Sequence, residues 1–313
     1  MKLSLKTHSG RPDRPVVLLI HGLGMNNYFW VDPQECHVLG GLAPLTIFLA
    51  DAQEQTKNTI SFGTVNPGIR GLWACLKNEG FSLASWSQQQ PLGPIQLAIE
   101  ELKIALIRVR KIWPGRPVYL VAHSRGGLLA RHYLQEEGAD DIAGLVTICS
   151  PHSGTNMAKF SRYLKPAGVF LEKIVPDGSR AMLTKALGRL STFFQSPAIE
   201  ELTPDAGFIA SLTEPLPEKL RLLSFGGTSP LLFQLVVRLP AGKQKTIKFP
   251  DMLCRAVPAE HLPEELAPGF GDALVSAKSA SLPGGKHYDF PDNHVRAAYD
   301  QKIHEIIVDF LKG

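Results

Sequence analysis

One serine stands where a short apolar run gives way to two glycines. Residues 118–129 read VYLVAHSRGGLL, with Ser124 just before the glycine pair. A sharp turn from strand to helix crowds its apex residue, so small residues are needed two positions before and after it, and here these are Ala122 and Gly126. Such a turn presents the Ser124 hydroxyl as a nucleophile. The alternative is an ordinary serine that caps the following helix.

Acyl transfer through a serine needs more than the hydroxyl. A base must remove its proton, an acid must orient that base, and N–H donors must stabilise the tetrahedral oxyanion. The helix after Ser124 aims its N-terminal N–H groups towards the site, where negative charge would develop. The local pattern is that of G-x-S-x-G with Ala122 in place of the first glycine.

Four separated stretches resemble the α/β-hydrolases of the lipase and esterase kind, especially the bacterial lipases that carry AHSxGG. They are LLIHGLGMN, VAHSRGG, SPHSGT, and GDALVSAKSASLPG together with NHVRAAYD. The resemblance covers the core from about residue 14 to the C-terminus, whereas residues 28–90 and 154–217 match only loosely. It implies an α/β-hydrolase fold in which the nucleophile, the acid and the histidine follow one another in the chain.

The resemblance makes Asp272 the preferred acid. It begins the loop GDALVSAKSA, which leads into an apolar stretch and is similar to the acid loop of the family. Asp205 and Asp251 are weaker candidates, and Asp205 could instead begin a helix. The alternative for Asp272 itself is a turn aspartate beside Gly271, since Gly-Asp is common in turns.

Histidines downstream of the serine are the candidate bases. His294 is favoured because it precedes the final helix, and its setting NHVRAAYD is similar to the histidine loop of the family. His287 is the rival and His261 a further candidate, whereas His304 falls within the final helix and is expected to pack or to face solvent. His152 lies too close to the preceding strand to fit the order.

Two backbone N–H groups are expected to form the oxyanion hole: that of Arg125, after the serine, and that of Leu23, after the first buried strand. Gly22 and Gly24 let the main chain approach the substrate, and His21 is expected to support the loop by hydrogen bonding. His123 and Gly126, which flank the turn, complete the set of supporting residues.

The elements that position these residues alternate along the chain. Apolar runs predict buried strands at 16–20, 117–122 and 142–150, and further strands are expected at 81–86 and 219–227. Amphipathic periodicity predicts helices at 95–113, 127–137 and 295–313. Strands that are apolar throughout and alternate with helices indicate a mostly parallel central sheet covered by helices on both faces. The fold class is therefore α/β, and the resemblance makes it the α/β-hydrolase fold.

Between residues 154 and 217 the pattern becomes helical, with helices expected at 157–175 and 180–194. We interpret 154–217 as an inserted helical cap or lid, and 1–153 with 218–313 as the α/β-hydrolase core. The short basic stretch with Lys243, Lys245 and Lys248 is expected to be a solvated loop or edge strand.

Composition excludes several other classes of protein. A net charge of +4 over 313 residues, without a basic cluster, does not indicate a surface that binds nucleic acid. No apolar run approaches the length of a membrane span, and no signal peptide is visible, so a cytoplasmic location is the default expectation. The four cysteines show no CxxC spacing and are expected to be free thiols. No metal motif and no nucleotide-binding glycine motif is found, so we expect no metal and no cofactor.

These residues predict a serine hydrolase that cleaves a small-molecule or lipid carboxylic ester through an acyl-enzyme. Abundant Leu, Phe and Ile in residues 154–237 favour an apolar acyl group and leave open a peripheral contact with lipid through the cap. A thioesterase or an acyltransferase would use the same three residues. The alternative outside the enzymes is a non-catalytic binding protein with the same fold. The sequence leaves the oligomeric state open.

Overall fold

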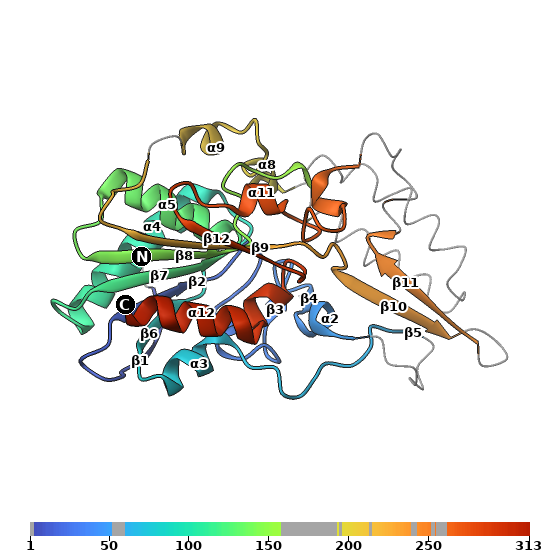
Figure 1. Ribbon diagram of the computed structural model, residues 1–313, viewed down its shortest axis with the longest axis horizontal. Coiled ribbons are helices and arrows are strands. Elements are labelled where there is room, and N and C mark those ends of the chain that lie inside the picture. The colour runs from blue at the N-terminus through green and yellow to red at the C-terminus, as the bar shows by residue number, and fades with distance from the viewer. Residues whose placement is uncertain are drawn as a thin grey trace.

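A computed structural model of the protein describes residues 3–51, 60–157, 193, 196–212, 215–238, 243–251, 254 and 262–313. A seven-stranded sheet runs through its centre in the order β1-β6-β2-β7-β8-β9-β12 (Figure 1). The strands are β1 (Leu5–His8), β2 (Val16–Ile20), β6 (Ser82–Trp86), β7 (Val118–His123), β8 (Ile142–Ile148), β9 (Arg221–Gly227) and β12 (Lys286–Phe290). All neighbours are parallel except β1, which pairs antiparallel with β6 at one edge.

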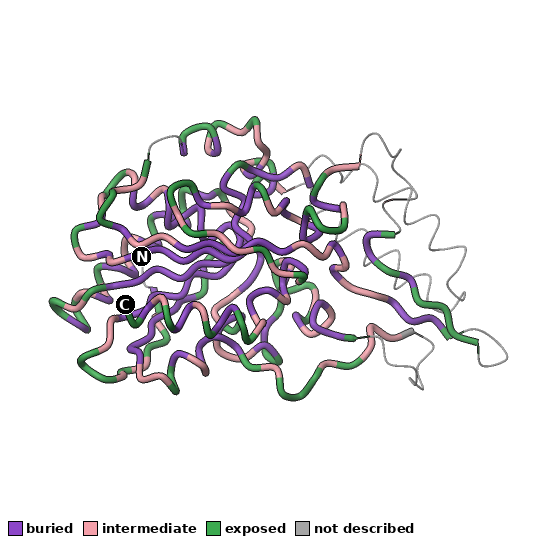
Figure 2. Tube along the Cα trace, viewed as in Figure 1, coloured by how far each residue is buried: buried purple, intermediate pink, exposed green. Residues whose placement is uncertain are grey.

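Helices cover both faces of this sheet. On one face α4 (Ile95–Ile112) packs beside α5 (Arg125–Glu137), and on the other α3 (Leu72–Asn78) packs against α12 (Gln301–Lys312) (Figure 1). The central strands β2, β6 and β7 are buried along their whole length, as the purple centre of the tube in Figure 2 shows. Strands covered on both sides favour apolar residues on both faces, which explains the unbroken apolar run of β2, while β6 also buries Ser82 and Ser85.

Shorter elements surround the ends of the strands. They are α1 (Tyr28–Val31), β3 (His37–Val38), β4 (Ala43–Pro44), α2 (Thr46–Leu49), α8 (Pro197–Glu200), α9 (Gly207–Ser211), η4 (Glu264–Leu266), α11 (Ala277–Ala280) and η5 (Arg296–Tyr299). A separate three-stranded sheet, β11-β10-β5, is formed by β5 (Ile60–Ser61), β10 (Phe233–Arg238) and β11 (Gln244–Phe249). The exposed Lys245 and Lys248 lie on β11, an edge strand of this sheet.

The α/β fold with a mostly parallel sheet is confirmed. One boundary differs: the helix expected over 295–313 is broken at Asp300, and η5 precedes the break and α12 follows it. The Asp300 side chain accepts hydrogen bonds from the N–H groups of Lys302 and Ile303, so it caps a new helix rather than continuing the old one. Both helices expected in the cap lie almost wholly outside the described residues.

Two further observations concern the whole chain. All four cysteines are free; Cys36 and Cys149 are buried, and Cys75 and Cys254 are half-buried. In the part of the chain that the structure describes, no helix is both long enough and apolar enough to cross a membrane.

Candidate active site

Ser124 lies at the apex between β7 and α5 in a conformation that few residues with a side chain adopt. Its φ is +54° and its ψ is −129°. Small neighbours make the turn feasible, since a Cβ on Gly126 would lie 2.7 Å from the carbonyl oxygen of Ile20, and one on Gly22 would lie 2.9 Å from the Cβ of Ser124. The serine side chain makes no capping hydrogen bond to α5, which argues against a purely capping role.

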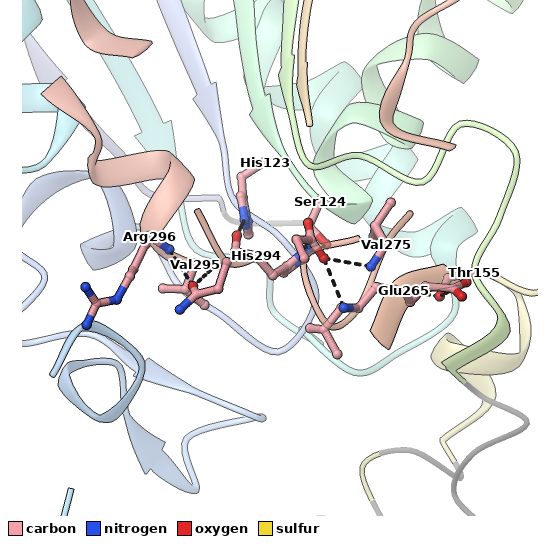
Figure 3. Close-up of polar contacts among 11 residues, drawn as sticks. His123, Ser124, Thr155, Glu265, Val275, His294, Val295 and Arg296 are labelled. Atoms are coloured by element: carbon pink, nitrogen blue, oxygen red, sulfur yellow. Dashed lines mark hydrogen bonds and ion pairs between the residues drawn. The ribbon is translucent and has the colours of Figure 1, made fainter. Parts of the chain in front are cut away.

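A chain of hydrogen bonds connects this serine with a histidine and an aspartate, of which Figure 3 labels Ser124 and His294. The Nε2 atom of His294 lies 3.0 Å from the Oγ atom of Ser124, and its Nδ1 atom lies 2.9 Å from the Oδ2 atom of Asp272. The other carboxylate oxygen, Oδ1, accepts hydrogen bonds from the N–H groups of Leu274, at 2.9 Å, and Val275, at 2.7 Å. Asp272 is fully buried, so its carboxylate is held in one orientation.

His123, directly before the serine, anchors the loop that carries His294. Its Nε2 atom donates to the carbonyl oxygen of His294 at 2.8 Å, while the N–H group of His294 donates to the carbonyl oxygen of Asp272 at 3.0 Å. Burial first, and then the neighbouring His294 ring, hold the pKa of His123 well below its usual range. A neutral His123 with its proton on Nε2 fits the carbonyl that it contacts.

Asn293 stabilises the same loop and was not singled out from the sequence. Its Oδ1 atom accepts hydrogen bonds from the N–H groups of Val295, at 3.0 Å, and Arg296, at 2.9 Å (Figure 3). Its Nδ2 atom donates to the carbonyl oxygen of Leu231 at 2.8 Å. The signal in the sequence was the asparagine itself, because Asn side chains commonly bond to backbone two and three residues ahead.

Glu265 supports the aspartate loop in a similar way. Its Oε1 atom accepts a hydrogen bond from the N–H group of Asn156 at 2.7 Å, and its carbonyl oxygen accepts one from the N–H group of Ala273 at 2.9 Å. It thereby connects the segment after β8 to the residue that follows Asp272. Sequence reasoning missed Glu265 because the contact joins residues far apart in the chain.

Cys149 lies behind the aspartate and is also outside the set predicted from the sequence. Burial, and then the Asp272 carboxylate with which the thiol interacts, raise the pKa of Cys149 well above its usual range. Donor atoms of Cys149, Asp272 and His294 lie within 4.8 Å of one another, a group whose atom types could hold a metal ion. A metal there would have to replace the existing hydrogen bond between His294 and Asp272.

The loop after β2 lies directly against the serine. The Nδ1 atom of His21 donates to the carbonyl oxygen of Gly22 at 2.9 Å, and its Nε2 atom accepts from the N–H group of Gln88 at 3.1 Å. Burial lowers the pKa of His21 to about 4, so the ring is neutral at pH 7. Because a trans peptide points its N–H away from its C=O, fixing the Gly22 carbonyl also fixes the N–H direction of Leu23.

The backbone N–H groups predicted to bind an oxyanion have no protein partner in the described part of the chain. Within the residues that the structure describes, the backbone N–H groups of Leu23 and Arg125 donate no hydrogen bond to protein. The N–H group of Gly24, by contrast, donates to the carbonyl oxygen of Pro91 at 2.9 Å, and Gly24 has a φ of +66°. Both groups are thus available as donors, and their role in binding an oxyanion stays a prediction.

The other candidate bases and acids lie elsewhere. His287 is on β12, where its Nδ1 atom lies 2.8 Å from the Oγ atom of Ser224 and its Nε2 atom 3.0 Å from the Oδ1 atom of Asp289, so both ring nitrogens are engaged there. His304 is buried in α12 and bonds to the carbonyl oxygen of Ala298. Asp205 precedes α9, Asp251 follows β11, and His261 lies outside the described residues.

His152 is a buried histidine next to this region whose titration should affect stability. Its Nε2 atom lies 3.1 Å from the Oγ1 atom of Thr147. Burial, followed by the nearby charges of Arg131 and His287, lowers its pKa from 6.5 to about 3. Between these two values the unfolded chain binds a proton that the folded chain rejects, so the free energy of unfolding falls as the pH falls.

Replacing His152 with Gln should therefore reduce the dependence of the free energy of unfolding on pH below pH 6.5. Glutamine keeps a hydrogen-bonding side chain but does not titrate, which removes a contribution of up to about 1.4 kcal/mol per pH unit below pH 6.5. Urea unfolding at several pH values between 7 and 4.5 measures this slope in both proteins. Other buried histidines contribute equally in the native protein and in His152→Gln. If the free energy of unfolding falls with the same slope in both proteins, His152 does not cause the loss of stability in acid.

Comparisons with known proteins agree with this architecture. A family model described as "Alpha/beta hydrolase family" matches residues 17–299. The mature form of the Bacillus licheniformis lipase BlEst2 superposes with a TM-score of 0.60 at 16% identity, with 98% of each chain covered. Its propeptide form gives a TM-score of 0.58 at 15% identity, covering 98% of this chain and 53% of that one.

A thermostable carboxyl esterase from Bacillus coagulans gives a TM-score of 0.48 at 13% identity, covering 99% of this chain and 94% of that one. No curated protein sequence matches the chain. The two BlEst2 superpositions, at 15–16% identity, show a shared fold and leave the substrate open.

Proposed function

The chain belongs to the α/β-hydrolase family, and on that basis we propose that it is a serine hydrolase that cleaves carboxylic esters through an acyl-enzyme intermediate. The observation that carries the proposal is the series of contacts from the Oγ atom of Ser124 through His294 to the buried carboxylate of Asp272. Nucleophile, base and orienting acid are thus already within hydrogen-bonding distance, as this chemistry requires.

In acylation, the Nε2 atom of His294 takes the hydroxyl proton while the Oγ atom of Ser124 attacks the ester carbonyl carbon. The carbonyl oxygen becomes an oxyanion, and the N–H groups of Leu23 and Arg125 are the donors proposed to stabilise it. As the tetrahedral intermediate collapses, the C–O bond to the alcohol breaks and His294 gives its proton to the departing oxygen. Asp272 keeps the ring oriented and stabilises its charged form.

In deacylation, water replaces the alcohol. His294 removes a proton from the water, whose oxygen attacks the acyl carbonyl carbon and forms a second tetrahedral intermediate. That intermediate releases the carboxylic acid and returns the proton to the Oγ atom of Ser124. The sequence of steps consumes one water for each ester and restores the free enzyme.

Apolar side chains beside the proposed oxyanion loop favour an apolar acyl group. A Cβ placed on Gly24 would lie 3.0 Å from a ring atom of Phe193 and 3.2 Å from a methyl carbon of Leu92, so both side chains pack onto this loop. Apolar pockets with few polar groups are typical of sites for small apolar ligands. A cap formed by residues 154–217 would add to this surface and exclude water during the reaction, as lids do in other enzymes.

Hydrolysis of p-nitrophenyl esters from acetyl to palmitoyl tests the function, together with covalent labelling by a fluorophosphonate. We expect turnover with an optimum above acetyl and labelling of one serine for each chain. A parallel series of acyl thioesters distinguishes a thioesterase, which uses the same residues, from an esterase. A protein that neither labels nor turns over any ester or thioester would contradict the proposal and favour a binding role.

A further inference from the structure

Arg125 has a side chain whose burial calls for an explanation. It is the first residue of α5 and is completely buried, although a cation is disfavoured both in the protein interior and at the positive end of a helix. Burial lowers the pKa of the guanidinium to about 10, so it remains charged at pH 7. Carboxylates of Glu201 and Glu101 interact with it through space.

The guanidinium makes one hydrogen bond in the described part of the chain. Its Nη2 atom donates to the carbonyl oxygen of Gly93 at 2.9 Å, whereas its Nε and Nη1 atoms have no partner there. A buried charge with unused donors costs folding free energy, so stability alone does not account for Arg125, and its one contact is the place to look for another role. That contact is with residues 87–94, the loop between β6 and α4.

Residues 87–94 hold the proposed oxyanion loop at both of its ends. At one end Gln88 donates its backbone N–H to the ring of His21 at 3.1 Å and its side-chain Nε2 to the carbonyl oxygen of His21 at 3.4 Å. At the other end the carbonyl oxygen of Pro91 accepts the N–H of Gly24 at 2.9 Å. Leu23 lies between these two attachments, and Gly93 is two residues beyond Pro91.

The two proposed oxyanion donors are therefore connected through one side chain. We propose that the Arg125 guanidinium is a positioning residue: by holding Gly93, it fixes residues 87–94 and hence the N–H of Leu23 relative to the N–H of Arg125 itself. This inference rests on the proposed function. Two donors must lie about 3 Å from the same developing oxyanion, so a displacement of one against the other weakens stabilisation of the transition state more than binding of the substrate.

Arg125→Met tests the proposal, with Arg131→Met as the matched control. Arg131 is also buried and also lies on α5, but its guanidinium donates to the carbonyl oxygens of His152 and Leu212, away from residues 87–94. We expect Arg125→Met to lower kcat by about 10-fold to 100-fold with KM changed less than about threefold. Arg131→Met should lower Tm comparably while kcat stays within about threefold of the native value.

Affinity for an alkyl boronic acid, which imitates the tetrahedral intermediate, should fall in parallel with kcat in Arg125→Met only. Unchanged kcat in Arg125→Met, or equal losses of kcat in both variants, would overturn the proposal. If Arg125→Met does not fold, Arg125→Lys keeps the charge without the reach of the guanidinium. A tenfold or larger loss of kcat in Arg125→Lys supports the hydrogen bond as the cause, and full kcat shows that it is not.

The native protein separates this inference from the proposed function. If it neither labels with a fluorophosphonate nor hydrolyses esters, the function itself fails before the arginine variants are compared. If the native protein labels and turns over while Arg125→Met equals it in kcat and boronate affinity, only the role of Arg125 fails.

Discussion

Ser124→Ala is expected to lower kcat for ester hydrolysis by about a million-fold and to abolish fluorophosphonate labelling. The substitution removes the only atom of this residue that can form the acyl bond. It leaves His294 and Asp272 in place, because their mutual contact at 2.9 Å does not involve the serine. Activity should fall without loss of fold, and circular dichroism with thermal unfolding checks that the variant is native.

Ser224→Ala is the matched control for this experiment. Ser224 is also a buried serine whose Oγ atom contacts a histidine, at 2.8 Å from the Nδ1 atom of His287, and that histidine contacts an aspartate. The residue types are the same, but Ser224 lies in the middle of β9 rather than at the apex of a strand-to-helix turn. Labelling and turnover should therefore survive Ser224→Ala. Labelling retained in Ser124→Ala and lost in Ser224→Ala would show that Ser224, beside His287 and Asp289, is the nucleophile instead.

His294→Ala should lower kcat by about a million-fold, comparable to loss of the nucleophile, because members of such a triad act as a unit. Without the ring, no other side chain among the described residues lies within hydrogen-bonding distance of the Oγ atom of Ser124 to take its proton. His287→Ala, measured on the same ester, is expected to keep kcat within about threefold. Both ring nitrogens of His287 are engaged by Ser224 and Asp289, so this histidine has no free position from which to act on Ser124.

The two histidine variants together decide the identity of the base. The pH dependence of kcat/KM gives a second readout. In the residual activity of His294→Ala, the fall of kcat/KM at low pH that comes from protonation of the base should be absent. Near-normal turnover in His294→Ala combined with lost turnover in His287→Ala would show that the base has been wrongly assigned.

The central sheet and the nucleophile turn could be predicted because their signals are local. Strand β2 occupies the same residues, 16–20, that the apolar run indicated, and β7 and α5 differ from their predicted bounds by one or two residues. Burial on both faces leaves an unbroken apolar run, and the turn at Ser124 leaves small residues at fixed offsets.

Edge strands could not be predicted in the same way. Strand β12 reads KHYDF, and its residues are exposed or half-buried because one side of the strand has no partner. The antiparallel strand β1, LKTH, is similar. Such segments become strands through pairing with a distant neighbour, which leaves no apolar run in their own sequence.

The residues that support the site were missed for a related reason. Glu265 contacts Asn156, 109 residues away in the chain, and Gln88 contacts His21, 67 residues away. The side chains that could carry out chemistry are recognisable by type, whereas those that hold them in place are ordinary polar residues. Their roles depend on which loops the fold brings together.

Backbone strain is concentrated around the proposed site. Apart from Leu39, the non-glycine residues with positive φ in the described chain are Ser124 at +54°, Cys149 at +52° and Ala273 at +84°. The last two flank the carboxylate of Asp272, since Cys149 interacts with it and Ala273 follows it in the chain. Each such residue costs on the order of 1–3 kcal/mol, which the surrounding sheet must offset.

The strained residues around the proposed site set stability against activity. Glycine would relieve the strain at any of these three positions, but at position 124 it would also remove the hydroxyl proposed as the nucleophile, so stability and activity oppose each other there.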